Sequence, residues 1–270
     1  MSQAFALALA AGTLVIAWIV GGALLAARRR RRPLRHSLTE AERRTLTEWL
    51  PAGHRLPPEL RDRLERLTAV FVGERSFVGC GGLTVTPEMK LAIAAQACLL
   101  VLGRDTHVYD ELRAVLVYPS QFIVPEQWHD EHGVVTDEER VLAGQAWDQS
   151  RIILSWEDVG ARGDEGEAFN VVIHEFAHYI DHESDGAPWI HDAEARRRWR
   201  QLLDVELERL RAANQRGERT FLDPYAAQDL SEFFAVASET FFEEPRRLAQ
   251  SLPTLYAALR EIYRLDTATW

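Results

Sequence analysis

The sequence predicts an α+β protein that is rich in helices, has a small sheet and is preceded by one N-terminal transmembrane helix. Three observations support this fold class: an uncharged apolar run at the start, two short strand-like stretches near the middle, and helical segments on either side of them. Hydrophobic residues make up 47% and charged residues 27% of the chain, as in globular proteins. The two cysteines are too few for a disulfide framework, so an ordinary hydrophobic core must hold the domain together.

The N-terminal apolar run predicts a membrane anchor. Residues 4–27 carry no charge and would span about 36 Å as a helix, more than the roughly 30 Å of a hydrocarbon core. The alternative is a cleaved secretory signal, but no basic residue precedes the run, and Arg28–Arg32 follow it directly. Because arginines favour the cytoplasmic side, we expect residues 1–35 to anchor the protein in the inner or plasma membrane, with a domain over 36–270 in the cytoplasm.

The charge distribution separates this anchor from the rest of the chain. Six of the 31 Lys and Arg residues are arginines within 28–35, which leaves 25 to face all 41 Asp and Glu residues in 36–270. A field of that sign repels phosphates, so a generic nucleic-acid binder is excluded. We expect the arginine block to contact lipid headgroups.

The sequence predicts three helices in the first half of the domain. Ser37 can cap the first, with Glu40 at its third position. Pro58 opens the second. The third runs from Pro87 to Gly103, and both cysteines are expected to pack there as small apolar residues.

Two strands are expected next, over Ala114–Tyr118 and Arg151–Trp156, because both stretches are short, branched and apolar. In the segment between them the hydrophobic residues follow neither a helical nor a strand period, so we expect a long surface excursion. Residues 160–167 are expected to form a polar loop. Helical patterns resume at Phe169. Two further helices are expected over 191–216 and 225–243.

The sequence His174-Glu175-Phe176-Ala177-His178 predicts a metal site. Residues four apart share one helix face, so both imidazoles can reach one zinc ion at about 2.0–2.1 Å. Glu175 can lie beside an open metal position and exchange a proton with a water molecule there. A chance match is the alternative, but the motif follows the apolar run VVI, and a buried unpaired histidine pair would be costly.

A catalytic site of this kind needs a third protein ligand. His182 continues the spacing but lies about 12 Å along the axis from His174, too far to share one ion. A second helix offers Glu232 among apolar neighbours, where a carboxylate needs a partner, so we predict it as the third ligand. Glu239 can hydrogen-bond a ligand histidine or be a solvated carboxylate, and the sequence favours neither. Tyr225 precedes Glu232 by seven residues, two turns along the same expected helix face.

Together, the segments HEFAHYID and DPYAAQDLSEFFAVASETFF resemble the Mlc titration factor A family of zinc peptidases and, more distantly, the catalytic domain of anthrax lethal factor. The likeness covers residues 70–265. It implies a zincin-like metallopeptidase domain with one zinc ion bound by His174, His178 and Glu232. It also implies Glu175 as the general base and Tyr225 as the hydroxyl that stabilises the oxyanion. From the residues alone, Tyr225 could equally be a core tyrosine.

The function expected from this resemblance is a membrane-anchored zinc metallopeptidase, either an aminopeptidase or an endopeptidase, that acts on a peptide or protein substrate. Manganese, cobalt or nickel would suit the same ligands. Arg151–Trp156 is expected as the edge strand that receives an extended peptide, although Trp156 can also be plain core. The alternative is a peptidase-like binding module that sequesters a regulatory partner with weak or no turnover. The family's cytosolic member is a partner of the glucose repressor Mlc, a role that the membrane segment of this chain places in doubt.

Overall fold

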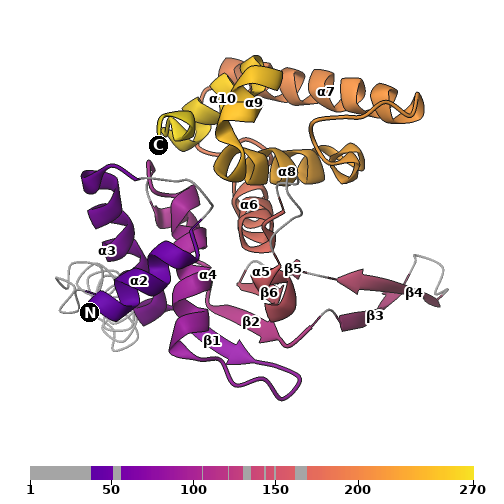
Figure 1. The fold of residues 1–270 in the computed structure, drawn as a ribbon. Helices are drawn as coiled ribbons and strands as arrows, with labels where there is room; N and C mark the ends of the chain where they lie inside the picture. The colour runs from indigo at the N-terminus through magenta and orange to yellow at the C-terminus, as the bar shows by residue number, and fades with distance from the viewer. Residues whose placement is uncertain are drawn as a thin grey trace, which may run out of the picture. The chain divides into compact units, whose positions relative to one another are not determined.

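A four-stranded sheet with the strand order β1-β2-β6-β5 lies against the helices of the fold (Figure 1). The computed structural model of the chain describes residues 38–50, 56–104, 106–120, 122–129, 135–142, 144–148, 150–161 and 169–270. Within these residues, Leu38–Trp270 forms one unit by its internal contacts. The helix expected over 4–27 lies outside the described residues, and no helix inside them is both long and apolar enough to cross a membrane.

The sheet combines parallel and antiparallel pairing. The strands are β1 (Ser76–Gly79), β2 (Ala114–Tyr118), β5 (Gly144–Asp148) and β6 (Arg151–Ser155). β1 and β2 pair in parallel, as do β2 and β6, whereas β5 is antiparallel to β6. Alternate residues of β2 are buried, and four successive residues of β6 are buried, because β6 lies between two strands and under a helix.

One expectation about the strands is wrong, and another is incomplete. β6 is an inner strand between β2 and β5, so Arg151–Trp156 cannot be the edge that receives a peptide. Trp156, the last residue of the expected strand, instead begins the short helix α5 (Trp156–Gly160). Its ring contacts that of Trp49, with 5.3 Å between the centroids. The expected surface excursion contains three strands: β5 and the antiparallel pair β3 (Phe122–His129) and β4 (Val135–Leu142).

The helices of the first half surround one helix whose last ten residues are all buried. α4 (Pro87–Leu100) is capped by Thr86, and every residue from Leu91 to Leu100 is buried. α2 (Glu40–Glu48), α3 (Pro58–Glu74) and a later helix cover it, which explains its apolar character on all sides.

Three details of this half differ from the sequence expectations. The cap of α2 is Thr39, paired with Glu42, because their side chains and backbone amides satisfy each other. α4 ends before Gly103, which lies in the following turn, where a Cβ would come within 2.3 Å of the carbonyl oxygen of Tyr263. Cys98 is buried in α4 as expected, but Cys80 lies after β1 and is half-buried.

The second half of the fold is helical and begins with α6 (Val171–Glu183), which packs on β5 and β6. α8 (Leu230–Glu243) packs across α6 (Figure 1). The remaining helices contact α8: α7 (Ala193–Gln215), α9 (Pro245–Ser251) and α10 (Pro253–Tyr263). α6 and α8 are therefore each buried between other elements, which fixes their mutual position.

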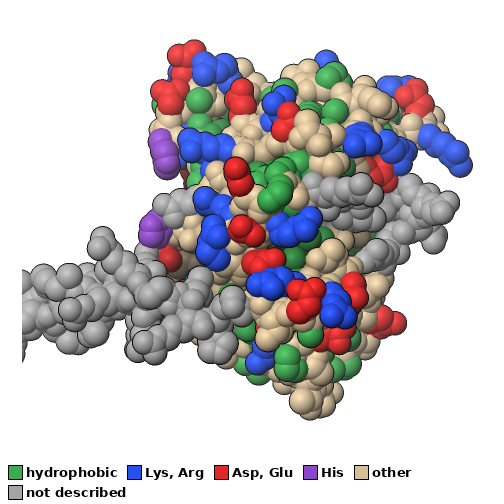
Figure 2. Space-filling model, turned by 60° about the vertical axis from the view of Figure 1, so that its left-hand side comes forward, with side chains coloured by type: hydrophobic (Ala, Val, Ile, Leu, Met, Phe, Trp, Pro, Cys, Tyr) green, Lys and Arg blue, Asp and Glu red, His purple; other side chains and the backbone are tan. Residues whose placement is uncertain are grey.

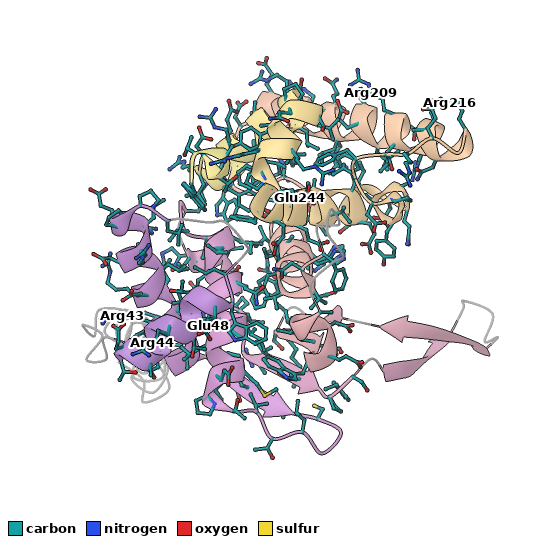
Figure 3. All side chains as sticks on the ribbon, viewed as in Figure 1. Arg43, Arg44, Glu48, Arg209, Arg216 and Glu244 are labelled. Carbon is teal, nitrogen blue, oxygen red and sulfur yellow. The ribbon has the colours of Figure 1, made fainter. Side chains whose placement is uncertain are left out.

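Charged side chains lie on the outside of this core. Acidic and basic groups are interspersed on the face shown in Figure 2. Arg43 of α2 donates to Glu65 of α3 over 2.9 Å, and Arg209 lies on α7, with Arg216 directly after its end (Figure 3). Exposed ion pairs of this kind contribute at most about 1 kcal/mol each, so the apolar core carries the stability of the fold.

Candidate metal centre

The start of α6 is fixed by one asparagine. The side chain of Asn170 caps the helix by accepting the N–H of Ile173 over 3.0 Å. Its amide nitrogen donates to Gln96 of α4 over 2.7 Å and to Glu243 of α8 over 2.6 Å. A buried cap with partners on two other helices sets the position of α6 along its own axis.

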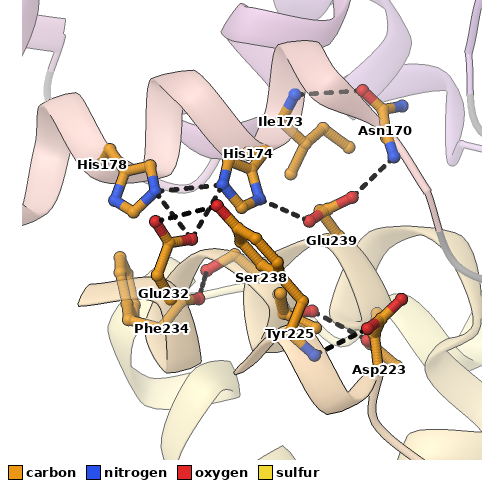
Figure 4. A network of polar contacts seen from close by, with 12 residues as sticks. Asn170, Ile173, His174, His178, Asp223, Tyr225, Glu232, Phe234, Ser238 and Glu239 are labelled. Carbon is orange, nitrogen blue, oxygen red and sulfur yellow. Dashed lines mark hydrogen bonds and ion pairs between the residues drawn. The ribbon is translucent and has the colours of Figure 1, made fainter. Parts of the chain in front are cut away.

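Three side chains from α6 and α8 converge on one point (Figure 4). Nε2 of His174 lies 3.0 Å from Nε2 of His178. Oε2 of Glu232 lies 3.2 Å and 3.3 Å from these two nitrogens. Ligand atoms at 2.0–2.1 Å around a tetrahedral ion are separated by about 3.3 Å, so the spacing suits one metal ion. This is the group of potential ligands that the described residues bring together, and all three are the ones predicted.

Each histidine uses its other ring nitrogen for a contact with α8. Nδ1 of His174 lies 2.7 Å from Oε1 of Glu239, and Nδ1 of His178 lies 2.9 Å from the hydroxyl of Ser231. A proton on Nδ1 leaves the lone pair of Nε2 directed at the shared point, which is the tautomer that a metal ligand needs. Glu239 is 3% exposed, so its interpretation as a solvated carboxylate is wrong.

The electrostatics of the cluster call for a positive charge at its centre. Oε2 of Glu232 is buried and has no hydrogen-bond partner among the described residues. Burial raises the pKa of Glu232, but its contacts with His174 and His178 outweigh burial and lower the pKa to about 2. Burial lowers the pKa of His174, but Glu232 and Glu239 raise it to about 10. Without an ion, the proton that this pKa keeps on His174 at neutral pH supplies the positive charge. A metal cation that displaced this proton would find two nitrogen lone pairs and a buried carboxylate oxygen.

Glu175 is buried on α6 beside this cluster. Burial raises its pKa to about 7, with smaller raising effects from Glu232 and Glu239 and lowering effects from the two histidines. A carboxyl group with a pKa near neutrality can take up and release a proton at neutral pH.

Tyr225 lies over the cluster but not on the helix where the sequence placed it. It belongs to the short 3₁₀ helix η2 (Pro224–Ala227), and α8 begins only after Asp229, whose carboxylate caps it. The hydroxyl of Tyr225 donates to Oε1 of Glu232 over 3.4 Å, and its ring lies 6.2 Å from that of His174. Its side chain is 48% exposed, so it is not a core tyrosine.

The hydroxyl of Tyr225 keeps its proton at neutral pH. Burial raises its pKa to about 12, with Glu232 and Glu175 adding to the effect. His182, by contrast, is exposed in the last turn of α6 and does not join the cluster, as its spacing predicted.

Two polar residues near the site were not predicted from the sequence. Asn170 follows a helix N-cap pattern, because a capping residue stands directly before an apolar helical run. Ser231 gives no such signal, since its role depends on how α8 crosses α6.

Comparison with known proteins gives the same assignment as the motifs. A family model described as "Glucose-regulated metallo-peptidase M90" matches residues 25–264. The chain belongs to the M90 metallopeptidase family. The resemblance stated from the two motifs is therefore confirmed.

Relatives of this M90 protein match most of its length. Mlc titration factor A of Pectobacterium atrosepticum is 35% identical over 235 residues, which cover 82% of this chain and 87% of that protein. Mlc titration factor A of Serratia proteamaculans is 32% identical over 240 residues, covering 82% and 88%. An uncharacterized protein of Synechocystis is 35% identical over 228 residues, covering 82% of each chain. Membership in the M90 family thus extends over the helices and the sheet that hold the cluster.

Proposed function

We propose that this M90 protein is a metal-dependent peptidase with one zinc ion held by His174, His178 and Glu232. The observation that carries the proposal is the convergence of two Nε2 atoms and Oε2 of Glu232 within 3.3 Å, with that oxygen buried and without a hydrogen bond from the described part of the chain. Both histidines have their Nδ1 atoms occupied, so all three ligand atoms offer lone pairs to the same point.

The neighbouring side chains suit peptide hydrolysis. A zinc ion bound there would polarise a peptide carbonyl and acidify a water molecule. Glu175, with its pKa raised to about 7 by burial, takes a proton from the attacking water. It then passes that proton to the peptide nitrogen as the carbon–nitrogen bond breaks. Tyr225 remains protonated and donates its O–H to the negative oxygen that forms on the carbonyl carbon.

The peptide or protein substrate is proposed to lie along β5. This strand ends the described sheet next to β6, and it packs against the metal-centre helix α6. Its outer edge leaves backbone N–H and C=O groups that an extended chain can pair with. Main-chain pairing would hold the substrate and leave sequence preference to side-chain pockets.

A second candidate function is regulatory binding of a partner protein, with weak or no turnover. The two relatives named Mlc titration factor A favour this candidate over hydrolysis, because their name refers to a protein that they titrate. In this case the metal centre would shape the binding surface, and the physiological partner would be a regulatory protein.

We also propose that residues 1–35 anchor the protein in the inner or plasma membrane, with the domain from 36 onward in the cytoplasm. The support is the uncharged run over 4–27 followed by the arginine block. Protease treatment of sealed, inside-out membrane vesicles should digest the domain. Protection of the domain in those vesicles would contradict the orientation.

The full chain, purified in detergent, tests the two functions together. Zinc content and hydrolysis of a peptide library are measured for the unaltered protein, for Glu175→Gln and for His174→Ala. The peptidase proposal expects one zinc ion per chain in the first two proteins, hydrolysis only in the unaltered one, and loss of zinc in His174→Ala.

Two results would change the conclusion. Zinc in the unaltered protein without hydrolysis of any peptide, together with tight binding of a regulatory protein, would favour the binding module. Absence of bound metal under all conditions would contradict the assignment of the metal centre.

A further inference from the structure

The two histidines of the metal centre are held in different ways. Nδ1 of His174 contacts a carboxylate directly, because Oε1 of Glu239 lies 2.7 Å away. Nδ1 of His178 instead contacts the hydroxyl of Ser231 at 2.9 Å. A hydroxyl accepts an N–H proton reliably only if its own proton points elsewhere, so the orientation of the Ser231 hydroxyl decides how well His178 is held.

Asp181 is a nearby carboxylate that could accept the proton of this hydroxyl. It follows His178 by three residues on α6 and therefore lies on the same side of the helix. Burial raises the pKa of this carboxylate to about 6, although His178, the side chain of Ser231 and Arg200 lie close enough to lower it. A Ser231 hydroxyl that donates its O–H to Asp181 would present a lone pair to Nδ1–H of His178, 2.9 Å away.

We propose that Asp181 and Ser231 form a relay that positions His178 as a metal ligand, equivalent to the direct contact of Glu239 with His174. Ser231 and Asp181 are positioning residues in this arrangement, since neither contributes an atom to the ligand cluster. The proposal deepens the metal-centre assignment and rests on it. Partners of this kind fix the tautomer and ring orientation of a ligand histidine and increase its basicity.

The capping turn of α8 places the relay and the third ligand together. Oδ1 of Asp229 accepts the backbone N–H of Ser231 and that of Glu232, each over 2.9 Å. The same cap therefore sets Glu232 at the metal position and Ser231 at the back of His178. Any shift of this turn would move one ligand and the support of another at once.

Loss of the serine hydroxyl has a defined consequence. Nδ1–H of His178 would lose its acceptor in a largely buried position, where its side chain is 18% exposed. The imidazole could then rotate or carry its proton on Nε2, and a protonated Nε2 cannot bind a metal.

Zinc affinity of the full chain in detergent tests the relay directly. Dissociation constants are measured by competition with a chromophoric chelator for the unaltered protein, Ser231→Ala, Asp181→Asn and the double variant. Each single change is expected to weaken zinc binding by about 10–100-fold. The double variant is expected to lose no more than the weaker-binding single variant, because both residues act through one chain of hydrogen bonds.

Two controls separate positioning from general damage. Thr240→Val removes a buried hydroxyl from the same helix, one that donates to the backbone carbonyl of Val236 over 2.8 Å, and should leave zinc affinity unchanged. Ser231→Thr retains a hydroxyl and should restore most of the affinity lost in Ser231→Ala. The unfolding temperature of each metal-free variant shows whether that variant folds. If Ser231→Ala does not fold, Ser231→Thr and Asp181→Asn still test the relay.

The outcomes distinguish the relay from the proposed function. Unchanged zinc affinity in Ser231→Ala, with zinc binding lost in His174→Ala, would overturn the relay and leave the metal centre standing. Additive losses in the double variant would also overturn it, since Asp181 would then act independently of Ser231. If the unaltered protein bound no zinc, both the relay and the metal centre would be wrong.

Discussion

The backbone N–H of Asn170 donates to Oε2 of Glu239 over 2.6 Å, across the crossing of α6 and α8. The other oxygen of the same carboxylate contacts Nδ1 of His174. One buried side chain thus joins the N-cap residue of the metal-centre helix to the first ligand on that helix. This carboxylate therefore links His174 to α8 in addition to the packing of the two helices.

Replacing Glu239 by Gln should weaken zinc binding without unfolding the protein. The amide keeps the shape of the side chain but loses the charge that increases the basicity of His174, so we expect about 10–100-fold lower zinc affinity. Competition with a chelator measures the change. Glu244→Gln is the matched control, because Glu244 follows the end of α8 and pairs with Arg247 away from the cluster. Equal zinc affinities in the two variants would contradict the role of Glu239.

Replacing Tyr225 by Phe should separate turnover from metal binding. The hydroxyl touches Glu232 only at 3.4 Å, and the side chain is half-exposed, so zinc affinity and stability should stay close to those of the unaltered protein. If the hydroxyl stabilises the oxyanion, kcat/KM for peptide hydrolysis should fall by about 10²–10³-fold. Steady-state kinetics at equal zinc occupancy measure this change. An unchanged kcat/KM would show that the Tyr225 hydroxyl does not stabilise the oxyanion.

Replacing Gly103 by Ala should destabilise the fold. The added Cβ would lie 2.3 Å from the carbonyl oxygen of Tyr263 and 2.7 Å from that of Arg264, so backbone must move. We expect a loss of about 1–3 kcal/mol in the free energy of unfolding, with a lower Tm. Gly73→Ala is the matched control in α3, where no atom lies within 4 Å of the added Cβ. That change should be neutral or stabilising by up to about 1 kcal/mol. A Gly103→Ala protein as stable as Gly73→Ala would contradict the close approach.

The two cysteines should differ in their reaction with iodoacetamide. Burial raises the pKa of Cys98 to about 12, partly offset by Thr68 and Arg75, so its reactive thiolate form is scarce between pH 7 and 9. Cys80 is half-buried after β1 and accessible. Mass spectrometry of the native protein should find Cys80 modified and Cys98 intact, and both modified after denaturation. Modification of native Cys98 at the rate of Cys80 would show that α4 is not buried.

The parts of the site that were predictable from the sequence depend on local spacing. His174 and His178 share a face because four residues make about one turn, and Glu232 stood out as a carboxylate among apolar residues. The partner of His178 was not predictable, because Ser231 meets it across two helices that are separate in the sequence. Tyr225 reaches the site as expected, but from its own 3₁₀ turn, because Asp229 starts a new helix.

Many of the individual helices and strands were predictable from the sequence, but their arrangement in space was not. β2 and β6 were recognised from their branched apolar residues, α3 and α4 from the prolines at their starts, and α6 from its helical pattern. The strand order was not predictable, because pairing between β5 and β6 is decided by tertiary contacts, and this made an inner strand look like an edge.

The cluster sits on helices whose packing does not depend on an ion. α6 and α8 bury their apolar faces against other elements, and Asn170 and Asp229 cap them with protein atoms alone. Each ligand side chain nevertheless retains an exposed fraction of 15–18%. The polypeptide can therefore reach its native shape first and acquire its cation afterwards, from whatever pool the compartment offers. Occupancy would then follow the supply of metal and could rise and fall during the lifetime of one molecule.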